Sequence, residues 1–135
     1  MTVTPFLTFA AGNAEAAARF YTEIFPDSSI ENIAYVENDG TQDAVASEKT
    51  VQTIAFTVAG SSFVAMDMAP EQVPAPSWAN SYLVELTEVS VYDRIFDVLS
   101  AEGDVMMSQD DFGPYQKVCW ITDKFQMTWQ LVCLR

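Results

Sequence analysis

The stretch TPFLTFAAGNAEAAARFYTEIFPDSSI, from Thr4 to Ile30, contains the signals for a strand, a helix and a second strand in that order. The apolar residues from Pro5 to Ala10 predict the first strand. Asn13 can cap a helix that runs from residue 14 to about residue 25, where a proline ends it. One face of this helix is apolar, with Ala17, Phe20, Tyr21 and Ile24 at helical spacing. We predict that the second strand runs from Ser29 to Glu37.

Four further segments complete the first half of the chain. The polar stretch from Asn38 to Thr50 predicts a loop. Two strands, Thr53 to Val58 and Ser62 to Met68, are predicted around the Ala59–Gly60 turn. The next segment, Ala69 to Asn80, contains three prolines in seven residues and predicts an extended linker.

The order strand, helix, strand, strand, strand then occurs a second time. Arg19 in the first helix aligns with Arg94 in the second at an offset of 75 residues (94 − 19). The second half begins with a strand at Ser81–Leu86 and a helix that Thr87 caps and Gly103 ends. A short strand at Val105–Ser108 and a polar turn at Gln109–Pro114 follow. A hairpin of two strands, Tyr115–Thr122 and Met127–Val132, completes it. We predict two modules, at about residues 1–68 and 80–135, joined by a linker at about 69–79. Each apolar sheet face would be buried against a helix, which predicts an α+β fold.

The charge of the chain excludes several classes of partner. Six basic residues stand against 19 acidic ones, so the net charge is −13. This charge repels phosphate groups, which argues against nucleic acids and anionic membranes. No apolar run reaches the roughly 18 residues that a membrane span requires, and no basic segment precedes an apolar one at the N-terminus. We therefore expect a cytoplasmic protein.

The chain contains no histidine and two cysteines, Cys119 and Cys133. A hairpin centred near Phe125 and Gln126 would place the two cysteines roughly opposite each other. In a reducing cytosol we expect two buried thiols that pack as small apolar groups rather than a disulfide. Thiolate chemistry at Cys119 would need a basic neighbour, so packing is the favoured role of this residue.

Three segments together resemble the PhnB-like branch of the vicinal oxygen chelate (glyoxalase/bleomycin resistance/dioxygenase) superfamily. They are the opening stretch from Thr4 to Ile30, the strand pair VQTIAFTVAGSSFVAMD, and the ending CWITDKFQMTWQLV from Cys119 to Val132. The resemblance implies two βαβββ modules that form a cupped mixed sheet, and a homodimer. Cys119 and Gln126 each replace a glycine of the family pattern. A side chain at the turn position of Gln126 suggests an altered hairpin geometry.

The resemblance also implies where a metal enzyme of this superfamily would hold its ion. The four positions fall on Phe6, near Ser81, on Ala65 or Asp67, and on Gln130. Phenylalanine cannot ligate a metal, and serine and glutamine are weak neutral ligands. Such a set cannot hold Zn²⁺, Fe²⁺ or Ni²⁺ tightly, so we expect neither a metal nor another cofactor.

Strand alternation predicts which side chains face the cup. One set of side chains should point toward the helices: Leu7, Phe9, Val64, Met66, Trp129, Leu131 and Cys133. The other set should point into the cup: Phe6, Thr8, Phe63, Ala65, Asp67, Thr128 and Gln130. Trp120 joins this second set if Cys119 lies beside Cys133. A largely apolar cup with a few polar groups is typical of a small-molecule site, although the same residues could form a filled core.

These patterns leave three functional hypotheses open. The first is a metal-independent protein that binds a small organic molecule, in one version a cation, through Phe6, Thr8, Asp67, Trp120 and Gln130. The second is a lyase, isomerase or dioxygenase with a divergent metal site, or an enzyme that uses Asp67 as an acid or base. The third is a structural dimer with a filled cup. Some PhnB-like proteins carry the name 3-demethylubiquinone-9 3-methyltransferase. No glycine-rich nucleotide loop follows the first strand here, so we treat that name as inherited.

Overall fold

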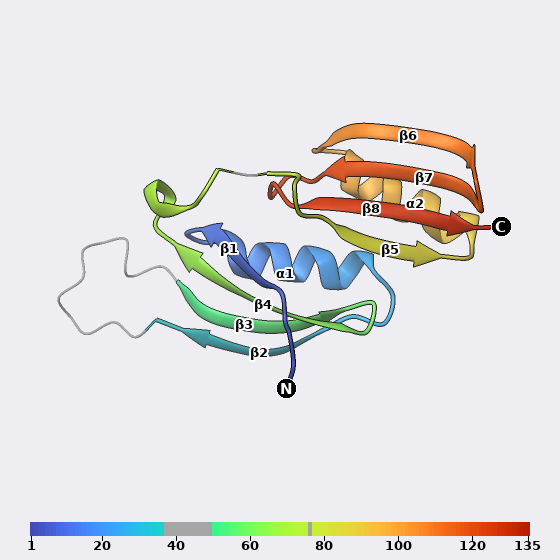
Figure 1. The fold of residues 1–135 in the computed structure, drawn as a ribbon. Coiled ribbons are helices and arrows are strands. Elements are labelled where there is room, and N and C mark those ends of the chain that lie inside the picture. The colour runs from blue at the N-terminus through green and yellow to red at the C-terminus, as the bar shows by residue number, and fades with distance from the viewer. Residues whose placement is uncertain (37–49, 76) are drawn as a thin grey trace. The chain divides into compact units, whose positions relative to one another are not determined.

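The computed structural model describes residues 1–36, 50–75 and 77–135. Contacts within the chain divide it into two compact units, Met1–Pro74 and Ala75–Arg135. Each unit contains one α-helix and one four-stranded sheet (Figure 1). Within the described residues, neither helix is long and apolar enough to cross a membrane.

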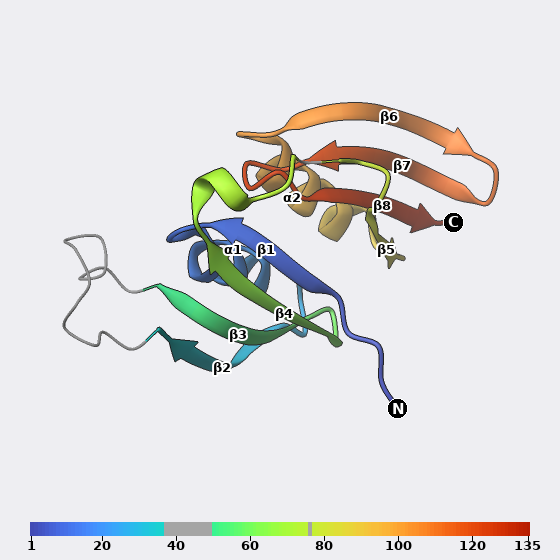
Figure 2. The ribbon, with the colours of Figure 1, turned by 60° about the vertical axis from the view of Figure 1, so that its left-hand side comes forward.

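The first unit is a βαβββ module. Its elements are β1 (Phe6–Ala10), α1 (Asn13–Ile24), β2 (Ser29–Tyr35), β3 (Val51–Val58) and β4 (Ser61–Met68), followed by the short 3₁₀ helix η2 (Pro70–Gln72). The sheet order is β1-β4-β3-β2, with β1 parallel to β4 and the other pairs antiparallel. Helix α1 lies along one face of this sheet (Figure 2).

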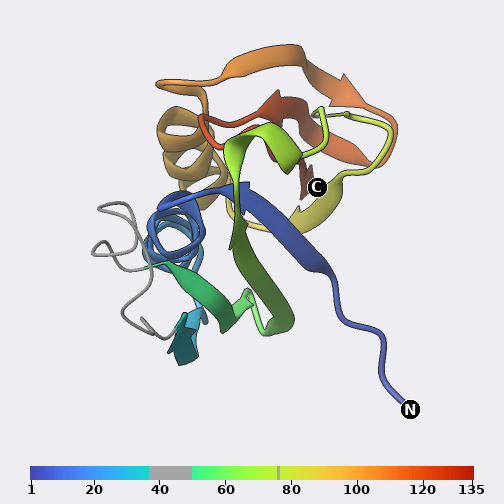
Figure 3. The same ribbon diagram turned by 90° about the vertical axis from the view of Figure 1, so that its left-hand side faces the viewer.

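The second unit repeats the same order of elements. It contains β5 (Tyr82–Leu86), α2 (Val89–Ser100), β6 (Asp104–Phe112), β7 (Tyr115–Thr122) and β8 (Thr128–Leu134). The sheet order is β5-β8-β7-β6, which is again first, fourth, third and second strand of the module. Helix α2 packs on this sheet as α1 packs on the other (Figure 3). The predicted α+β class and the repeated βαβββ modules are confirmed.

Each core lies between a helix and one face of its sheet. In the first unit the fully buried side chains include Tyr21, Ile54 and Phe56, and the rings of Phe56 and Phe63 stack at 5.5 Å. In the second unit they include Ile95 and Trp129. Burying side chains of this size removes apolar surface from water and accounts for most of the stability of each module.

Both predicted helix caps are wrong. Asn13 is the first residue of α1 rather than its cap, and Gly12 precedes it at φ 87°. The residue before α2 is Glu88, not Thr87. Neither helix has a side-chain hydrogen bond from its capping residue. For α1, another part of the module satisfies one of the free N–H groups, as described below.

The largest difference from the predicted strands is at β6. This strand extends to Phe112, so Asp110 and Asp111 lie in an exposed edge strand and not in the predicted polar turn. Asp110 pairs with Lys117 across the hairpin. Of the loop predicted at 38–50, only residue 50 lies within the described residues, and in the predicted linker residue 76 lies outside them.

The cysteine pairing is also offset from the prediction. Cys119 lies opposite Leu131, while Cys133 lies opposite Lys117. The hairpin is therefore centred on Phe125, half a residue earlier than the predicted centre between Phe125 and Gln126. Both cysteines are buried free thiols.

Candidate functional site

The sheet of the second unit has one face covered by α2 and one open face. Cys119 of β7 and its cross-strand partner Leu131 are both buried, so they lie on the face of the sheet that α2 covers. Strand alternation then places Trp120 on the open face, as predicted. Trp120 lies directly opposite Gln130 of β8, and these two predicted site residues are neighbours on one face.

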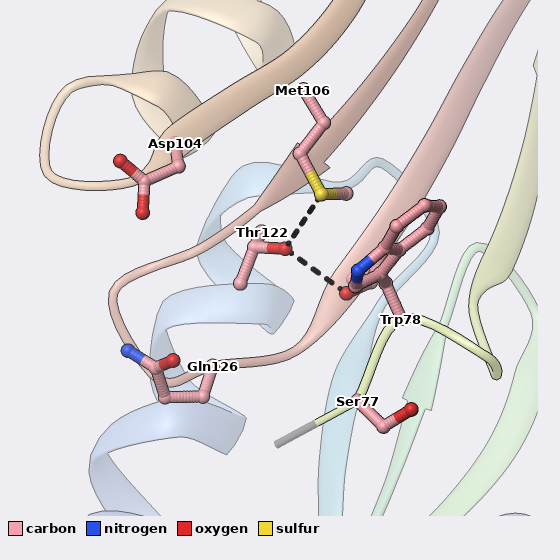
Figure 4. Close-up of a pocket in the computed structure, with 7 residues that line it drawn as sticks. Ser77, Trp78, Asp104, Met106, Thr122 and Gln126 are labelled. Atoms are coloured by element: carbon pink, nitrogen blue, oxygen red, sulfur yellow. Dashed lines mark hydrogen bonds between the residues drawn. The ribbon is translucent and has the colours of Figure 1, made fainter.

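A cavity of about 260 Å³ lies on this open face. Its wall comes from the segment before β5, from β6, and from the turn end of the β7–β8 hairpin. The lining residues are Ser77, Trp78, Asp104, Met106, Thr122, Gln126 and Thr128. Figure 4 shows the Thr122 side chain near the middle of this set, with Trp78 on one side and Asp104 and Gln126 on the other.

Two threonine hydroxyls form the polar floor of the cavity. Thr122 and Thr128 are cross-strand partners, and their hydroxyl oxygens lie 3.1 Å apart in a hydrogen bond (Figure 4). The Thr122 hydroxyl donates to the Met106 Sδ at 3.5 Å. Met106 reaches this position because a register shift between Val105 and Met107 makes it the extra residue of a bulge.

Two polar side chains of the lining, those of Asp104 and Gln126, are available to bind a ligand. Asp104 is the only charged residue of the lining. Its carboxylate is exposed and has no ion pair or hydrogen bond within the described part of the chain. Gln126 has φ 71°, in the left-handed region that favours glycine. Its backbone N–H donates to the Asp123 carbonyl at 2.9 Å, but its side-chain amide has no partner among the residues described.

The expectation of an altered hairpin geometry at Gln126 stays a prediction. Gln126 has a positive φ, as glycine would at this position, although it carries a side chain. Asp123 holds this turn together, because its carboxylate accepts the N–H groups of Phe125 at 2.8 Å and Met127 at 3.1 Å. Gln126 thus has a strained backbone conformation, and its side chain lines the cavity.

The two tryptophans beside the cavity form a second notable contact. Trp78 packs edge-on against Trp120, with ring centroids 5.3 Å apart. The Trp120 Nε1 atom is buried and has no hydrogen-bond acceptor in the described residues. A buried N–H without an acceptor is uncommon in folded proteins and calls for an explanation. Gln130, its cross-strand neighbour, donates through Nε2 to the Ser81 hydroxyl at 2.8 Å.

The predicted site residues of the first unit divide between the two faces of its sheet. Phe6 and Thr8 lie on the face away from α1, and Phe6 is 54% exposed. The prediction for Asp67 is wrong, because Asp67 faces the helix and is 5% exposed. Its Oδ1 accepts the N–H of Ala14 at 2.9 Å, and its Oδ2 accepts the N–H of Val51 at 2.8 Å.

The whole of β4 is reversed relative to the prediction. Phe63, Ala65 and Asp67 are the buried residues of the strand and face α1, whereas Val64 and Met66 alternate with them. The parallel register supports this, since Leu7 pairs with Ala65 and Phe9 with Asp67. In β8, by contrast, Trp129, Leu131 and Cys133 are buried as predicted.

The residues at the superfamily's metal positions do not fit a metal ion. Both Asp67 oxygens already accept backbone N–H groups on the helix face. Phe6 offers no ligand atom, and Gln130 is engaged with Ser81. In the part of the chain that the structure describes, no three His, Cys, Asp or Glu residues are grouped so that they could hold a metal. We therefore derive no reaction step through a metal.

Thiolate chemistry at Cys119 is disfavoured by its surroundings. Burial raises the pKa of the Cys119 thiol, and the hydrogen bond with Tyr92 only partly opposes this shift. Burial also raises the pKa of Tyr92, with the Cys119 contact adding to the effect. A thiol that stays protonated at neutral pH is a poor nucleophile, in agreement with the packing role predicted from the sequence.

Sequence reasoning missed most of the cavity. It placed Thr128 on the open face and singled out Gln126, but it did not predict Trp78, Asp104 or Met106 as site residues. The signal that could have drawn attention to Gln126 is the side chain at a turn position that normally carries glycine. The bulge that brings Met106 to the cavity has no comparable signal in the sequence.

Comparison with known proteins identifies the family. A sequence model described as 3-demethylubiquinone-9 3-methyltransferase matches residues 1–132. The chain belongs to this family. A PhnB protein from Bacillus cereus, described by the same methyltransferase name, is 30% identical over 98% of this chain and 99% of its own, with a TM-score of 0.82. No curated protein matches the chain.

Two further solved structures share the fold of this PhnB-like protein. Protein PA1353 from Pseudomonas aeruginosa has 19% identity over 99% of this chain and 98% of its own, with a TM-score of 0.81. A glyoxylase/bleomycin resistance protein/dioxygenase domain from Frankia sp. EAN1pec has 15% identity over 100% and 98%, with a TM-score of 0.62. The resemblance to the PhnB-like branch of the vicinal oxygen chelate superfamily is confirmed.

The methyltransferase description of the family implies a site for a methyl donor, and the first module does not fit one. The turn after β1 contains one glycine, Gly12, and leads directly into α1. The Asp67 carboxylate already accepts a hydrogen bond from the N–H of Ala14 in the first turn of this helix. A nucleotide-type loop needs several glycines and free N–H groups at this helix end. We therefore derive no methyl transfer.

Proposed function

We propose that this PhnB-like protein binds a small organic molecule without a metal, through the open face of its second module. The observation that carries the proposal is the cavity lined by Trp78, which combines an aromatic ring, a thioether, three hydroxyls, an amide and a carboxylate. Small-molecule sites typically join apolar walls to a few polar groups that set orientation. At about 260 Å³ the cavity is just below the usual size range of about 300–1,000 Å³, so the ligand is small.

The pair Trp120 and Gln130 supports the proposal. The buried Trp120 N–H lacks an acceptor, and the Gln130 side-chain oxygen accepts no hydrogen bond from the described residues. An unpaired buried donor costs about 1–3 kcal/mol, and a ligand oxygen would recover this cost. In this proposal, the ligand enters beside Trp78 and reaches the Trp120 indole from the cavity. Ligand contact through Phe6 and Thr8, on the open face of the first module, stays a separate prediction, whereas Asp67 is withdrawn as a ligand contact.

The three tryptophans of the chain provide an internal control for the test. Trp78 and Trp120 lie at the open face, whereas the Trp129 indole donates to Asp123 at 2.8 Å and is almost fully buried. We would screen small organic molecules by the indole N–H resonances of ¹⁵N-labelled protein. Saturable shifts of the Trp78 and Trp120 resonances, with Trp129 unchanged, would support the proposal. If no compound moves the first two resonances selectively, the proposal is wrong.

The enzyme alternative with a divergent metal site has its own test. Untagged protein would be analysed for bound metal after dialysis, because a histidine tag would supply ligands that the chain lacks. We expect no stoichiometric metal and no change in Tm with Zn²⁺, Ni²⁺, Mn²⁺ or Fe²⁺. Tight stoichiometric metal would restore the enzyme hypothesis. We further propose that the protein is a cytoplasmic homodimer, which sedimentation velocity and cell fractionation would test.

A further inference from the structure

We propose that Gln126 and Asp104 are the specificity-determining residues of the cavity, and that together they select a primary organic ammonium ion. This inference rests on the proposed small-molecule site and names its ligand class. Both residues line the same cavity, and both have side chains without a partner in the described residues. Figure 4 shows them on the same side of Thr122.

The backbone of Gln126 indicates that its side chain has a function. A residue with a Cβ at φ 71° carries a conformational cost that glycine would avoid. The hydrogen bond from its N–H to the Asp123 carbonyl would form equally well with glycine. Among the residues that the structure describes, the side chain has no hydrogen-bond partner that could offset the cost. Its one structural role among the described residues is to form a wall of the cavity. Strain of this kind, at a site, points to function.

The groups around the cavity define what it can bind. Asp104 provides the only charge, and it is negative. The basic residues in ion pairs contact other carboxylates, namely Glu15, Asp93, Glu102 and Asp111. Asp104 is therefore available to a cation, and it repels an anion. The Trp78 ring and the Met106 sulfur provide a polarisable wall that favours cations and apolar groups.

The number of acceptors favours an ammonium ion that donates several hydrogen bonds. The Asp104 carboxylate, the Gln126 side-chain oxygen and the threonine hydroxyls are all acceptors. A primary ammonium has three N–H donors, which match such a set, and its carbon substituent can lie against Trp78. A quaternary ammonium has no donors and would leave the Gln126 oxygen unpaired. The geometry therefore favours a primary amine over a quaternary one.

The test compares a matched pair of ligands on the full chain. We would titrate ¹⁵N-labelled protein at pH 7 with 2-phenylethylamine and with the neutral 2-phenylethanol, following the Trp78 indole resonance. We expect the amine to bind at least about tenfold more tightly than the alcohol, because a charged hydrogen bond is worth more than a neutral one. Higher salt should weaken the binding of the amine alone.

Variants of the two residues give readouts that a structural role would not produce. In Asp104→Asn we expect the Kd for the amine to rise about tenfold with no change for the alcohol. In Gln126→Gly we expect the Tm to rise by a few degrees while the Kd rises about tenfold. Ala59→Gly is the matched control. Ala59 also has a positive φ, at 50°, but lies in the β3–β4 turn, so its Tm should rise while the Kd stays unchanged.

Each contrary result overturns a defined part of the inference. Equal affinity for the amine and the alcohol would reject the ammonium class and leave the proposed small-molecule site intact. An unchanged Kd in Gln126→Gly would reject the role of Gln126. If neither ligand binds, the ammonium inference fails, and the broader screen with the tryptophan resonances decides the proposed function separately.

Discussion

Asp67 in β4 stabilises the start of helix α1 from outside the helix, because its carboxylate accepts the N–H of Ala14 at 2.9 Å. The second oxygen accepts the N–H of Val51, the first residue of β3, at 2.8 Å. One buried side chain thus satisfies backbone donors of two elements. A negative charge also interacts favourably with the N-terminal end of a helix. Asp67 is therefore a structural residue of the first module.

Replacing Asp67 with Asn should destabilise the protein. The Asn side chain presents an NH₂ group to one of the two backbone donors, which then remains buried and unpaired. We expect a loss of about 2–3 kcal/mol in the free energy of unfolding, measured by urea denaturation. The control is Asp97→Asn, on the exposed face of α2, which should change stability by less than about 0.5 kcal/mol. Equal effects of the two substitutions would contradict the structural role of Asp67.

The contrast between β4 and β8 shows what the sequence could predict. In β8 the large apolar residues alternate with Thr128 and Gln130, so the period-two pattern identifies the buried face. In β4 both faces carry apolar residues from Phe63 onward, and the only charged residue, Asp67, appeared to mark the open side. Its burial depends on N–H groups from two distant segments, which no local pattern reveals.

The candidate site was only partly predictable for a related reason. Trp120 and Gln130 were predicted because they lie in regular strands with clear alternation. The cavity instead depends on the β6 bulge, on the segment before β5, and on a turn residue with positive φ. The sequence of β6 contains Asp110 and Asp111, which resemble a turn, and this shortened the predicted strand. Tertiary pairing with β7 overrides that local preference.

The two tryptophans of the second sheet should respond differently to substitution by phenylalanine. Trp129→Phe removes the donor to the buried Asp123 carboxylate, so we expect a loss of about 3 kcal/mol or more. Trp120→Phe removes a donor that has no acceptor, so we expect a change of about 1 kcal/mol or less. Urea denaturation would measure both values.

A double-mutant cycle separates the hydrogen bond of Trp129 from the packing of its ring. In an Asp123→Ala background the acceptor is already absent, so Trp129→Phe should cost clearly less than it does in the wild type. Additive effects of the two substitutions would show that ring packing alone explains the cost.

The burial of the Cys119 thiol predicts a sensitivity to alkaline pH. The pKa of the folded Cys119 thiol is raised above its ordinary value of 9.0, mainly by burial. Above this ordinary value the unfolded chain loses the proton first, so the folded state binds more protons and stability falls as pH rises. We expect a loss of up to about 1 kcal/mol between pH 7.5 and 9.5 in urea denaturation. In Cys119→Ala the decline should be smaller, and an identical decline would contradict this assignment.

Gly103, which follows α2, is held in place by the backbone around it. A Cβ at this position would overlap the carbonyl oxygen of Thr122 and lie 2.8 Å from that of Leu99. Backbone atoms cannot move aside as a flexible side chain can, so Gly103→Ala should destabilise the protein by about 3 kcal/mol or more. Gly113→Ala is the control, because a Cβ there meets no atom within 4 Å and carries only the cost of φ 59°. That cost is about 1–2 kcal/mol. Urea denaturation of both variants would measure the difference, and a Gly103→Ala protein no less stable than Gly113→Ala would show that β7 does not approach α2 as closely as described.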